Sequence, residues 1–185
     1  MRTERLLLRR WQESDLEPFA TMNADPQVMG FFSSTLPRDE SDTFVQRIEK
    51  NFVENGFGLW AVEAPDGFIG FVGLWPAGHT IEGAESVEIG WCLASRAWGK
   101  GYATEAALAA RDDGFGRLGL SELVSMTSAI NWPSRAVMER IGMQHYPADD
   151  FIHPNLPADH RLSPCVMYRM ARPGRPPEQP VEISY

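Results

Sequence analysis

The segment Arg96-Ala97-Trp98-Gly99-Lys100-Gly101-Tyr102-Ala103-Thr104-Glu105 separates a predicted strand from a predicted helix. Its two glycines, one residue apart, allow a tight bend and let a ligand approach the backbone without a Cβ in the way. The following helix would present its unpaired N–H groups and the positive end of its dipole to that bend. Such a turn is suited to an anion, and a pyrophosphate would fit it.

Two well-known phosphate-binding motifs compete for this turn. A Walker loop requires G-x-x-x-x-G-K-[ST], but here Lys100 precedes Gly101 and no glycine stands at the required distance before it. A dinucleotide fingerprint requires Gly or Ala at its sixth position, where this chain has Thr104, and the acid expected beyond the next strand is missing because Glu122 precedes that strand. On this segment alone, a purely conformational role for Gly99 and Gly101 stays open.

The elements that flank the turn predict a parallel strand pair. Residues 85–93 alternate in polarity, which places Glu88 on the face opposite a bulky apolar row made of Val87, Ile89, Trp91 and Leu93. A helix over residues 102–118 follows, with a small-residue face for packing on a sheet and Gly119 at its end. Residues 123–127 predict the next strand. Strand, crossover helix and strand make a βαβ unit with a right-handed connection.

The remaining elements lie on both sides of this unit. Before it, the patterns predict a strand over 6–11, a helix over 14–23 capped by Ser14 with Glu17, a helix from 39 or 41 to 55, and a hairpin of strands 59–63 and 68–75. After it, they predict a helix over 133–141, a long loop over 145–164 and a last strand over 165–170. We therefore expect an α/β (α+β) fold.

Composition indicates one folded domain. With 185 residues, 43% of them hydrophobic, the chain can bury one good core. We expect the domain to span 1–171, followed by a proline-rich tail over 172–185. The apolar run near the N-terminus is too short for a signal peptide or a membrane span, so a cytoplasmic protein without a membrane partner is expected.

The net charge and the spacing of cysteine and histidine residues limit which partners and ligands are expected. The net charge of -8 argues against a nucleic-acid partner and is compatible with a cationic amine substrate. Cys92 and Cys165 lie far apart outside any CxxC pair, and the four histidines have no helical H-x-x-x-H spacing, so neither a metal site nor a disulfide framework is expected.

The turn resembles the [QR]-x-x-G-x-[GA] acetyl-CoA signature of the GCN5-related N-acetyltransferases (GNAT). The order of elements is similar to theirs across residues 6–170. Further motifs resemble the branch of the ribosomal-protein N-terminal (RimJ/RimL-like) acetyltransferases: an opening TERLxLR at 3–9, VEIGW at 87–91, Asn131-x-x-Ser134 and a closing Tyr168-Arg169-Met170. The resemblance implies a single GNAT-like domain, with a mixed, mostly antiparallel sheet, flanking helices and a splayed parallel strand pair.

The resemblance also implies where acetyl-CoA would bind. The pantetheine arm would insert between the splayed strands, and the pyrophosphate would lie on the turn. The cofactor contacts it implies are backbone bonds from Leu93 and Ala94, main-chain amides of Gly99, Lys100, Gly101, Tyr102 and Ala103, charge from Arg96 and Lys100, and the side-chain amide of Asn131.

The chemistry of acetyl transfer to an amine requires a base and benefits from an acid. Glu88 is the candidate base, through a water, because it lies on the strand that ends at the thioester; apolar surroundings would raise its pKa toward the working pH. Ser134 is the candidate donor to the departing thiolate, although a serine at a helix start also serves as an ordinary cap. Relatives outside this branch often carry a tyrosine acid where this chain has Met138. An acetyl-cysteine route through Cys92 lacks a placed base.

The acceptor stays open at this stage. A peptide or protein N-terminus and a small amine are both compatible with the motifs, and so is an inactive acyl-CoA-binding sensor that has lost proton handling. The fold analogy would build the amine pocket from Asn23, Phe31, Phe32, Trp75 and residues 153–161. The assembly is expected to be a monomer or a homodimer.

Overall fold

One mixed sheet organises the computed structural model, which describes residues 1–81 and 84–174. Its strands follow the order β1-β2-β3-β4-β5-β8-β6, with β7 added beside β8. Among the described strands, β4 and β5 are parallel and the other neighbours are antiparallel. The strands are β1 (Leu7–Arg9), β2 (Leu59–Ala64), β3 (Gly67–Ile81), β4 (Ala84–Leu93), β5 (Glu122–Ser128), β6 (Gln144–His145), β7 (Phe151–Ile152) and β8 (Pro164–Ala171). The predicted mixed, mostly antiparallel architecture is confirmed.

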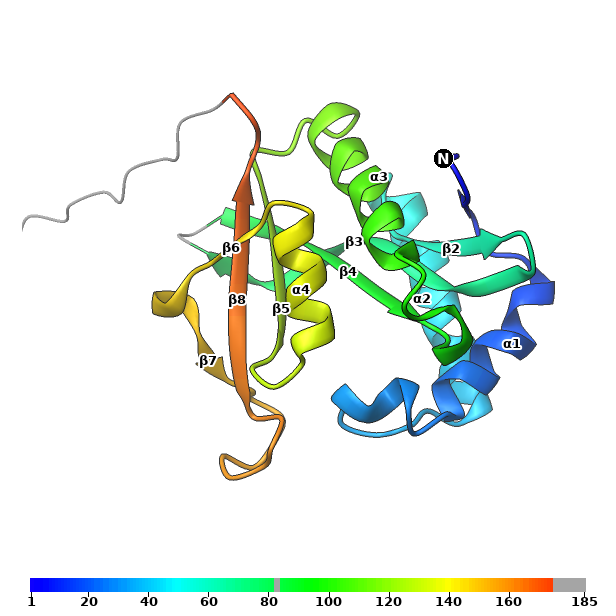
Figure 1. The fold of residues 1–185 in the computed structure, drawn as a ribbon, viewed down its shortest axis with the longest axis horizontal. Helices are drawn as coiled ribbons and strands as arrows, with labels where there is room; N and C mark the ends of the chain where they lie inside the picture. The colour runs from blue at the N-terminus through cyan, green and yellow to red at the C-terminus, as the bar shows by residue number, and fades with distance from the viewer. Residues whose placement is uncertain (82–83, 175–185) are drawn as a thin grey trace, which may run out of the picture.

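Helices cover both faces of the sheet (Figure 1). They are α1 (Glu13–Ala24), α2 (Arg38–Asn55), α3 (Tyr102–Gly116) and α4 (Trp132–Arg140), with short 3-10 turns at η1 (Val28–Phe31), η2 (Ser95–Ala97) and η3 (Pro147–Asp149). Phe71 of β3 meets Phe19 of α1 and Phe44 of α2, with ring centroids 6.0 and 5.9 Å apart. Leu74 faces the other way, against Gly114 of α3. Successive residues of a strand point to opposite faces of the sheet, and Phe71 and Leu74 are an odd number of residues apart. Helices α1 and α2 therefore lie on one face of the sheet and α3 lies on the other.

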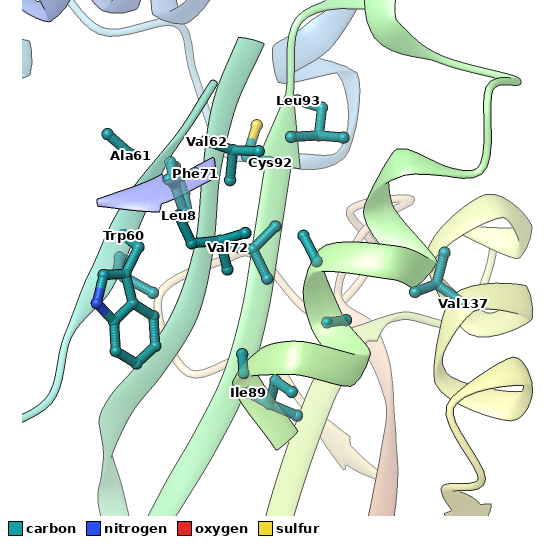
Figure 2. Close-up of a cluster of buried hydrophobic side chains, with 14 of the residues drawn as sticks. Leu8, Trp60, Ala61, Val62, Phe71, Val72, Ile89, Cys92, Leu93 and Val137 are labelled. Atoms are coloured by element: carbon teal, nitrogen blue, oxygen red, sulfur yellow. The ribbon is translucent and has the colours of Figure 1, made fainter. Parts of the chain in front are cut away.

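The core follows from this layering. Alanines 106, 107 and 110 are fully buried in α3, so the predicted small-residue face lets this helix approach the sheet closely. Figure 2 shows part of the main cluster, in which Val72 and Ile89 of neighbouring strands lie beneath α3. None of the helices in residues 1–81 and 84–174 is long and apolar enough to cross a bilayer.

The parallel pair separates soon after it forms. Its register joins Glu88 of β4 to Val124 of β5, and no further pair is recorded between these strands in the described chain. Beyond this point β4 continues to Leu93 and β5 to Ser128. In Figure 1 the two strands run apart below their meeting point, which leaves an opening between their C-terminal ends.

The first helix begins earlier than its sequence pattern predicts. Gln12, not Ser14, is the N-cap, and Asp15, not Glu17, supplies the reciprocal carboxylate, accepting a 2.9 Å hydrogen bond from the Gln12 N–H. Asp15 is buried and accepts two bonds from the Arg9 guanidinium, at 2.6 and 2.9 Å. This tertiary pairing with β1 selects the register of the cap, which local sequence could not reveal.

Two later boundaries also differ from the prediction. Helix α3 ends at Gly116 rather than at 118, because the Leu120 N–H bonds back to the Gly114 carbonyl at 3.0 Å while Gly119 takes the left-handed conformation, φ +69°. The predicted loop over 145–164 contains the end of β6, η3 and β7, and the strands β6 and β7 pair with β8 at the sheet edge.

The remaining predicted elements are present, although β1 is shorter than the predicted 6–11 and β3 continues past residue 75 to Ile81. Helix α2 ends at the left-handed Gly56, the hairpin of β2 and β3 turns at Pro65-Asp66, and α4 ends before Gly142, φ +94°. β8, the last described strand, ends at Ala171. The part of the proline-rich tail from residue 175 onward lies outside the described residues.

Candidate active site

A cleft of ≈ 1310 Å³ occupies the opening between β4 and β5. Both strands line it from the point where their pairing ends: Glu88 and residues 90–93 on one side, residues 125–128 on the other. The signature turn, the first half of α3 and the inner face of α4 complete the wall. The backbone groups of the separated strands are therefore available to a bound chain, as an added strand would require.

The signature turn leaves main-chain donors at the cleft. Gly99 and Gly101 adopt left-handed conformations, φ +73° and +79°, which residues with a Cβ rarely take. Within residues 1–81 and 84–174, the N–H groups of Gly99, Gly101, Tyr102 and Ala103 donate to no protein acceptor. Four residues of the turn thus supply unpaired donors at the positive end of α3, a combination that favours a phosphate group.

Residues near the N-terminus hold the turn in place. The Thr3 hydroxyl donates to Glu105 at 2.5 Å, and the Arg5 amide and guanidinium donate to the same carboxylate at 2.8 and 2.7 Å. Arg5 also donates to the Lys100 carbonyl at 2.9 Å. Partial burial opposes ionisation of Glu105, but the hydrogen bonds from Thr3 and Arg5 outweigh it and lower its pKa. The TERLxLR motif therefore has a physical role, which the pattern alone did not reveal.

The basic side chains of the turn, Arg96 and Lys100, do not line the cleft. The Arg96 guanidinium donates to the Phe68 carbonyl, and Lys100 is exposed with its ammonium 5.9 Å from the Tyr102 ring. Arg96 thus ties the turn to the β2–β3 hairpin. Arg140, on α4, is a basic residue that does line the cleft, and sequence reasoning missed it.

The backbone at the end of β4 is partly engaged. The Ala94 N–H donates to the Ile69 carbonyl at 2.8 Å and its carbonyl accepts from Ala97, so Ala94 has no free N–H to offer. The Leu93 carbonyl accepts from the Trp98 indole at 2.7 Å, and Leu93 lines the cleft. The structure therefore brings Leu93 to the site and leaves Ala94 at its margin.

Asn131 and Ser134 meet at the start of α4. Asn131 is the N-cap: its Oδ1 accepts from the Ser134 N–H at 3.3 Å and its Nδ2 donates to Thr127 Oγ1 at 2.9 Å. Both side chains line the cleft opposite β4. Asn131 fixes the position of Ser134 relative to β5, while the Ser134 hydroxyl has no protein partner in the described residues.

Glu88 lies where the two parallel strands begin to separate. Its direct cross-strand neighbours are Trp75 on β3 and Val124 on β5. The residue is half-buried, and desolvation raises its pKa to about 7, against the opposing effect of a hydrogen bond from the Met126 main chain. A carboxylate with a pKa near neutrality can take up a proton and return it at physiological pH.

Two other positions cannot supply a nucleophile or an acid for acetyl transfer. Cys92 lines the cleft, but burial raises the pKa of its thiol to about 12, so the nucleophilic thiolate is scarcely populated at neutral pH. Met138, where a tyrosine acid would stand in relatives outside the resembled branch, is buried in the core and does not line the cleft. In the described residues, no three His, Cys, Asp or Glu side chains are grouped as a metal site.

The segments expected to form an amine pocket converge on one end of the cleft. Phe31, Phe32, Trp75 and His153 line it. Asn23 lines an adjoining hollow of ≈ 410 Å³ instead, where its Nδ2 donates to Ser41. The expected segments are thus brought together, with Asn23 displaced to a neighbouring wall.

This arrangement fits acetyl-CoA, whose shape combines a diphosphate with an extended amide-bearing arm. The diphosphate matches the unpaired amides of the turn, and the arm matches the exposed edges of β4 and β5. The thioester at the end of the arm would then lie near Glu88 and Ser134, which line the same cleft.

Comparison with known proteins agrees with the geometry. Residues 5–144 match the model of the acetyltransferase (GNAT) domain family. The uncharacterised protein YkkB of Bacillus subtilis is 33% identical over 147 residues, which cover 78% of this chain and 84% of YkkB. A solved acetyltransferase from Agrobacterium tumefaciens shares 29% identity and a TM-score of 0.73 over 92% of each chain.

A more distant structure shares the fold alone. The ribosomal L7/L12 α-N-protein acetyltransferase RimL, solved with coenzyme A, has 14% identity and a TM-score of 0.74, covering 91% of this chain and 95% of its own. The family match spans most of the chain and includes the signature turn, the separated strands and Glu88. The chain therefore belongs to the GNAT family and is an N-acetyltransferase that uses acetyl-CoA.

Proposed function

We propose that this enzyme acetylates a primary amine by direct attack within a ternary complex, with Glu88 as the base. The observation that carries the proposal is the place of Glu88: it lines the cleft at the point where β4 and β5 separate, and its pKa is raised to about 7. An attacking amine must lose a proton, and a base of this pKa accepts it efficiently near neutral pH.

The bound cosubstrate supplies an activated acetyl group with a good thiolate leaving group. Glu88 takes the proton of the incoming ammonium, directly or through one water, and the Met126 N–H holds the resulting carboxyl in place. Ser134, fixed by the Asn131 cap, donates a hydrogen bond to the departing sulfur. Since the Cys92 thiol stays protonated, acetyl transfer proceeds without an acetyl-cysteine stage.

The test compares Glu88→Gln with the remote surface variant Glu54→Gln. We expect Glu88→Gln to lower kcat by about a hundredfold or more, to remove the limb near pH 7 from the pH profile, and to leave the Kd for CoA nearly unchanged. Glu54→Gln, at an exposed ion pair with Lys50, should match the parent enzyme. Unchanged turnover in Glu88→Gln would remove Glu88 from the mechanism.

Two-substrate kinetics test the order of events. Intersecting initial-velocity lines are expected for a ternary complex, whereas parallel lines would indicate a covalent acetyl-enzyme and contradict direct attack. Ser134→Ala should lower kcat with little effect on KM for the amine, because the hydroxyl acts on the leaving group. Equal kcat for Ser134→Ala would assign that serine to the helix start alone.

A further inference from the structure

The register of β3 and β4 creates an open floor next to Glu88. Phe71 pairs with Cys92 and Trp75 pairs with Glu88, so these four side chains share one face of the sheet. Gly90 lies between Cys92 and Glu88 on that face, and a Cβ added there would meet no atom within 4 Å. The absence of a side chain at Gly90 therefore leaves room for part of a ligand immediately beside the proposed base.

Aromatic side chains form the walls above this floor. Phe44 of α2 lies 5.9 Å from Phe71 and 6.3 Å from Trp75, between ring centroids, and both contacts are edge-on. Phe31 and Phe32 extend the aromatic surface outward, with 37% and 45% of their area exposed although they are large apolar residues. Aromatic walls of this kind gain free energy by burying an apolar group, and their faces also attract an ammonium.

Charge is sparse at this end of the cleft. In the described residues, the carboxylates that line the cleft besides Glu88 are Glu4 and Glu105, which belong to the signature-turn end. A polycation would need additional anionic partners, because each ammonium taken from water without one costs free energy. Asp39 and Glu40 line the adjoining hollow, but Arg47 lines it as well and would oppose a second cation there.

A hydrogen bond links the two outer edges of the aromatic end of the cleft. Arg161, in the segment between β7 and β8, donates to the Gly30 carbonyl of η1 at 2.6 Å. His153 and Leu156 from the same segment and Phe31 from η1 line the cleft. A link between the two edges restricts access by a long chain and favours a compact acceptor.

We propose that the acceptor is a small monoamine whose amine is joined to an aromatic or similarly bulky apolar group. The apolar group would lie on the Gly90 floor, against the packed rings of Phe44 and Trp75, with the amine directed to Glu88. This inference rests on the proposed acetyl transfer at Glu88 and specifies the substrate class of that site.

An amine panel separates the inference from the function on which it rests. The full chain is incubated with acetyl-CoA and one of 2-phenylethylamine, ethylamine, spermidine, an aminoglycoside or a short peptide, and thiol release is followed. We expect kcat/KM for 2-phenylethylamine to exceed that for spermidine and for the peptide by about tenfold or more. A preference for spermidine, the aminoglycoside or the peptide would overturn the inference while leaving acetyl transfer intact. If no amine in a broad set gives thiol release, the proposed function itself is contradicted.

A larger side chain at Gly90 tests the same inference by occupying the proposed position of the apolar group. Gly90→Val should raise KM for 2-phenylethylamine by about tenfold, with much less effect on ethylamine and an unchanged Kd for CoA. Gly116→Val is the matched control, since a Cβ at that exposed end of α3 also meets no atom within 4 Å. Phe32→Ala, at an exposed position that tolerates truncation, should also raise KM for 2-phenylethylamine more than KM for ethylamine. If both variants change the two amines equally, the apolar body does not lie there.

Discussion

The burial of Glu88 makes stability depend on pH in an unusual direction. Its pKa is raised from an ordinary 4.5 to about 7 in the folded protein. Below pH 4.5 both the folded and unfolded states hold the proton, and above pH 7 both have lost it. Between these values the folded state binds a proton that the unfolded state has released, so stability from this group falls as pH rises.

The size of the effect follows from the change in proton affinity. Each tenfold change is worth about 1.4 kcal/mol, so the shift from 4.5 to 7 corresponds to about 3 kcal/mol of unfolding free energy. Glu88→Gln keeps a hydrogen-bond acceptor for the Met126 N–H but cannot ionise. The substitution should therefore leave stability near pH 4.5 almost unchanged and raise it at pH 8.

Urea unfolding of the native protein and of Glu88→Gln, at several pH values between 4.5 and 8, measures how their difference in unfolding free energy changes with pH. Other titrating groups, such as Glu105 with its lowered pKa, contribute equally to both proteins and cancel in the difference. The difference in unfolding free energy should grow in favour of Glu88→Gln by about 3 kcal/mol across the range. A difference that stays constant with pH would show that Glu88 titrates normally, and would refute the reasoning for its role as a base.

Three further predictions test separate parts of the structure. Because the pKa of the Cys92 thiol is about 12, native protein at pH 8 should react slowly with iodoacetamide at this residue, and Cys92→Ser should keep its turnover; loss of turnover would reopen a covalent route. Asn131→Ala removes the cap of α4 and should cost about 1 kcal/mol in urea unfolding, whereas Asn131→Asp should restore the cap; equal losses would contradict the capping role. Asp15→Ala removes the buried partner of Arg9 and should lower the free energy of unfolding by about 3 kcal/mol. Glu17→Ala, at an exposed ion pair, should lower it by less than about 1 kcal/mol. Similar losses in the two variants would refute the assignment of the cap.

Elements whose signals are local were predictable from the sequence. The alternation over 85–93 predicted β4 with its two faces, and the glycine at 56 predicted the end of α2, because periodicity and left-handed glycines act within a few residues. The turn at 96–105 was predicted to be an anion site for the same reason. Its amides at Gly99, Gly101, Tyr102 and Ala103 have no protein acceptor in the described residues, and their binding of a phosphate stays a prediction.

Features that depend on distant partners were not predictable. The cap of α1 is set by Arg9 of β1, and the Arg96 side chain is drawn to the Phe68 carbonyl of the hairpin rather than to the cleft. The placement of Glu105 depends on Thr3 and Arg5, about a hundred residues away. Such contacts follow from tertiary packing, and single-sequence patterns carry no signal for them. The short strands β6 and β7 were missed for the same reason, since β8 organises them.

The proposed placement of the diphosphate on the signature turn can be tested amide by amide. In ¹⁵N–¹H spectra of the 20.7 kDa protein titrated with CoA, the N–H signals of Gly99, Gly101, Tyr102 and Ala103 should move strongly downfield at saturation, because these donors gain charged acceptors. Titration with pantetheine alone should leave the same four signals nearly unmoved while shifting residues of β4 and β5. If CoA binds tightly and these four amides do not respond, the phosphate site lies elsewhere and the account of this cleft is wrong.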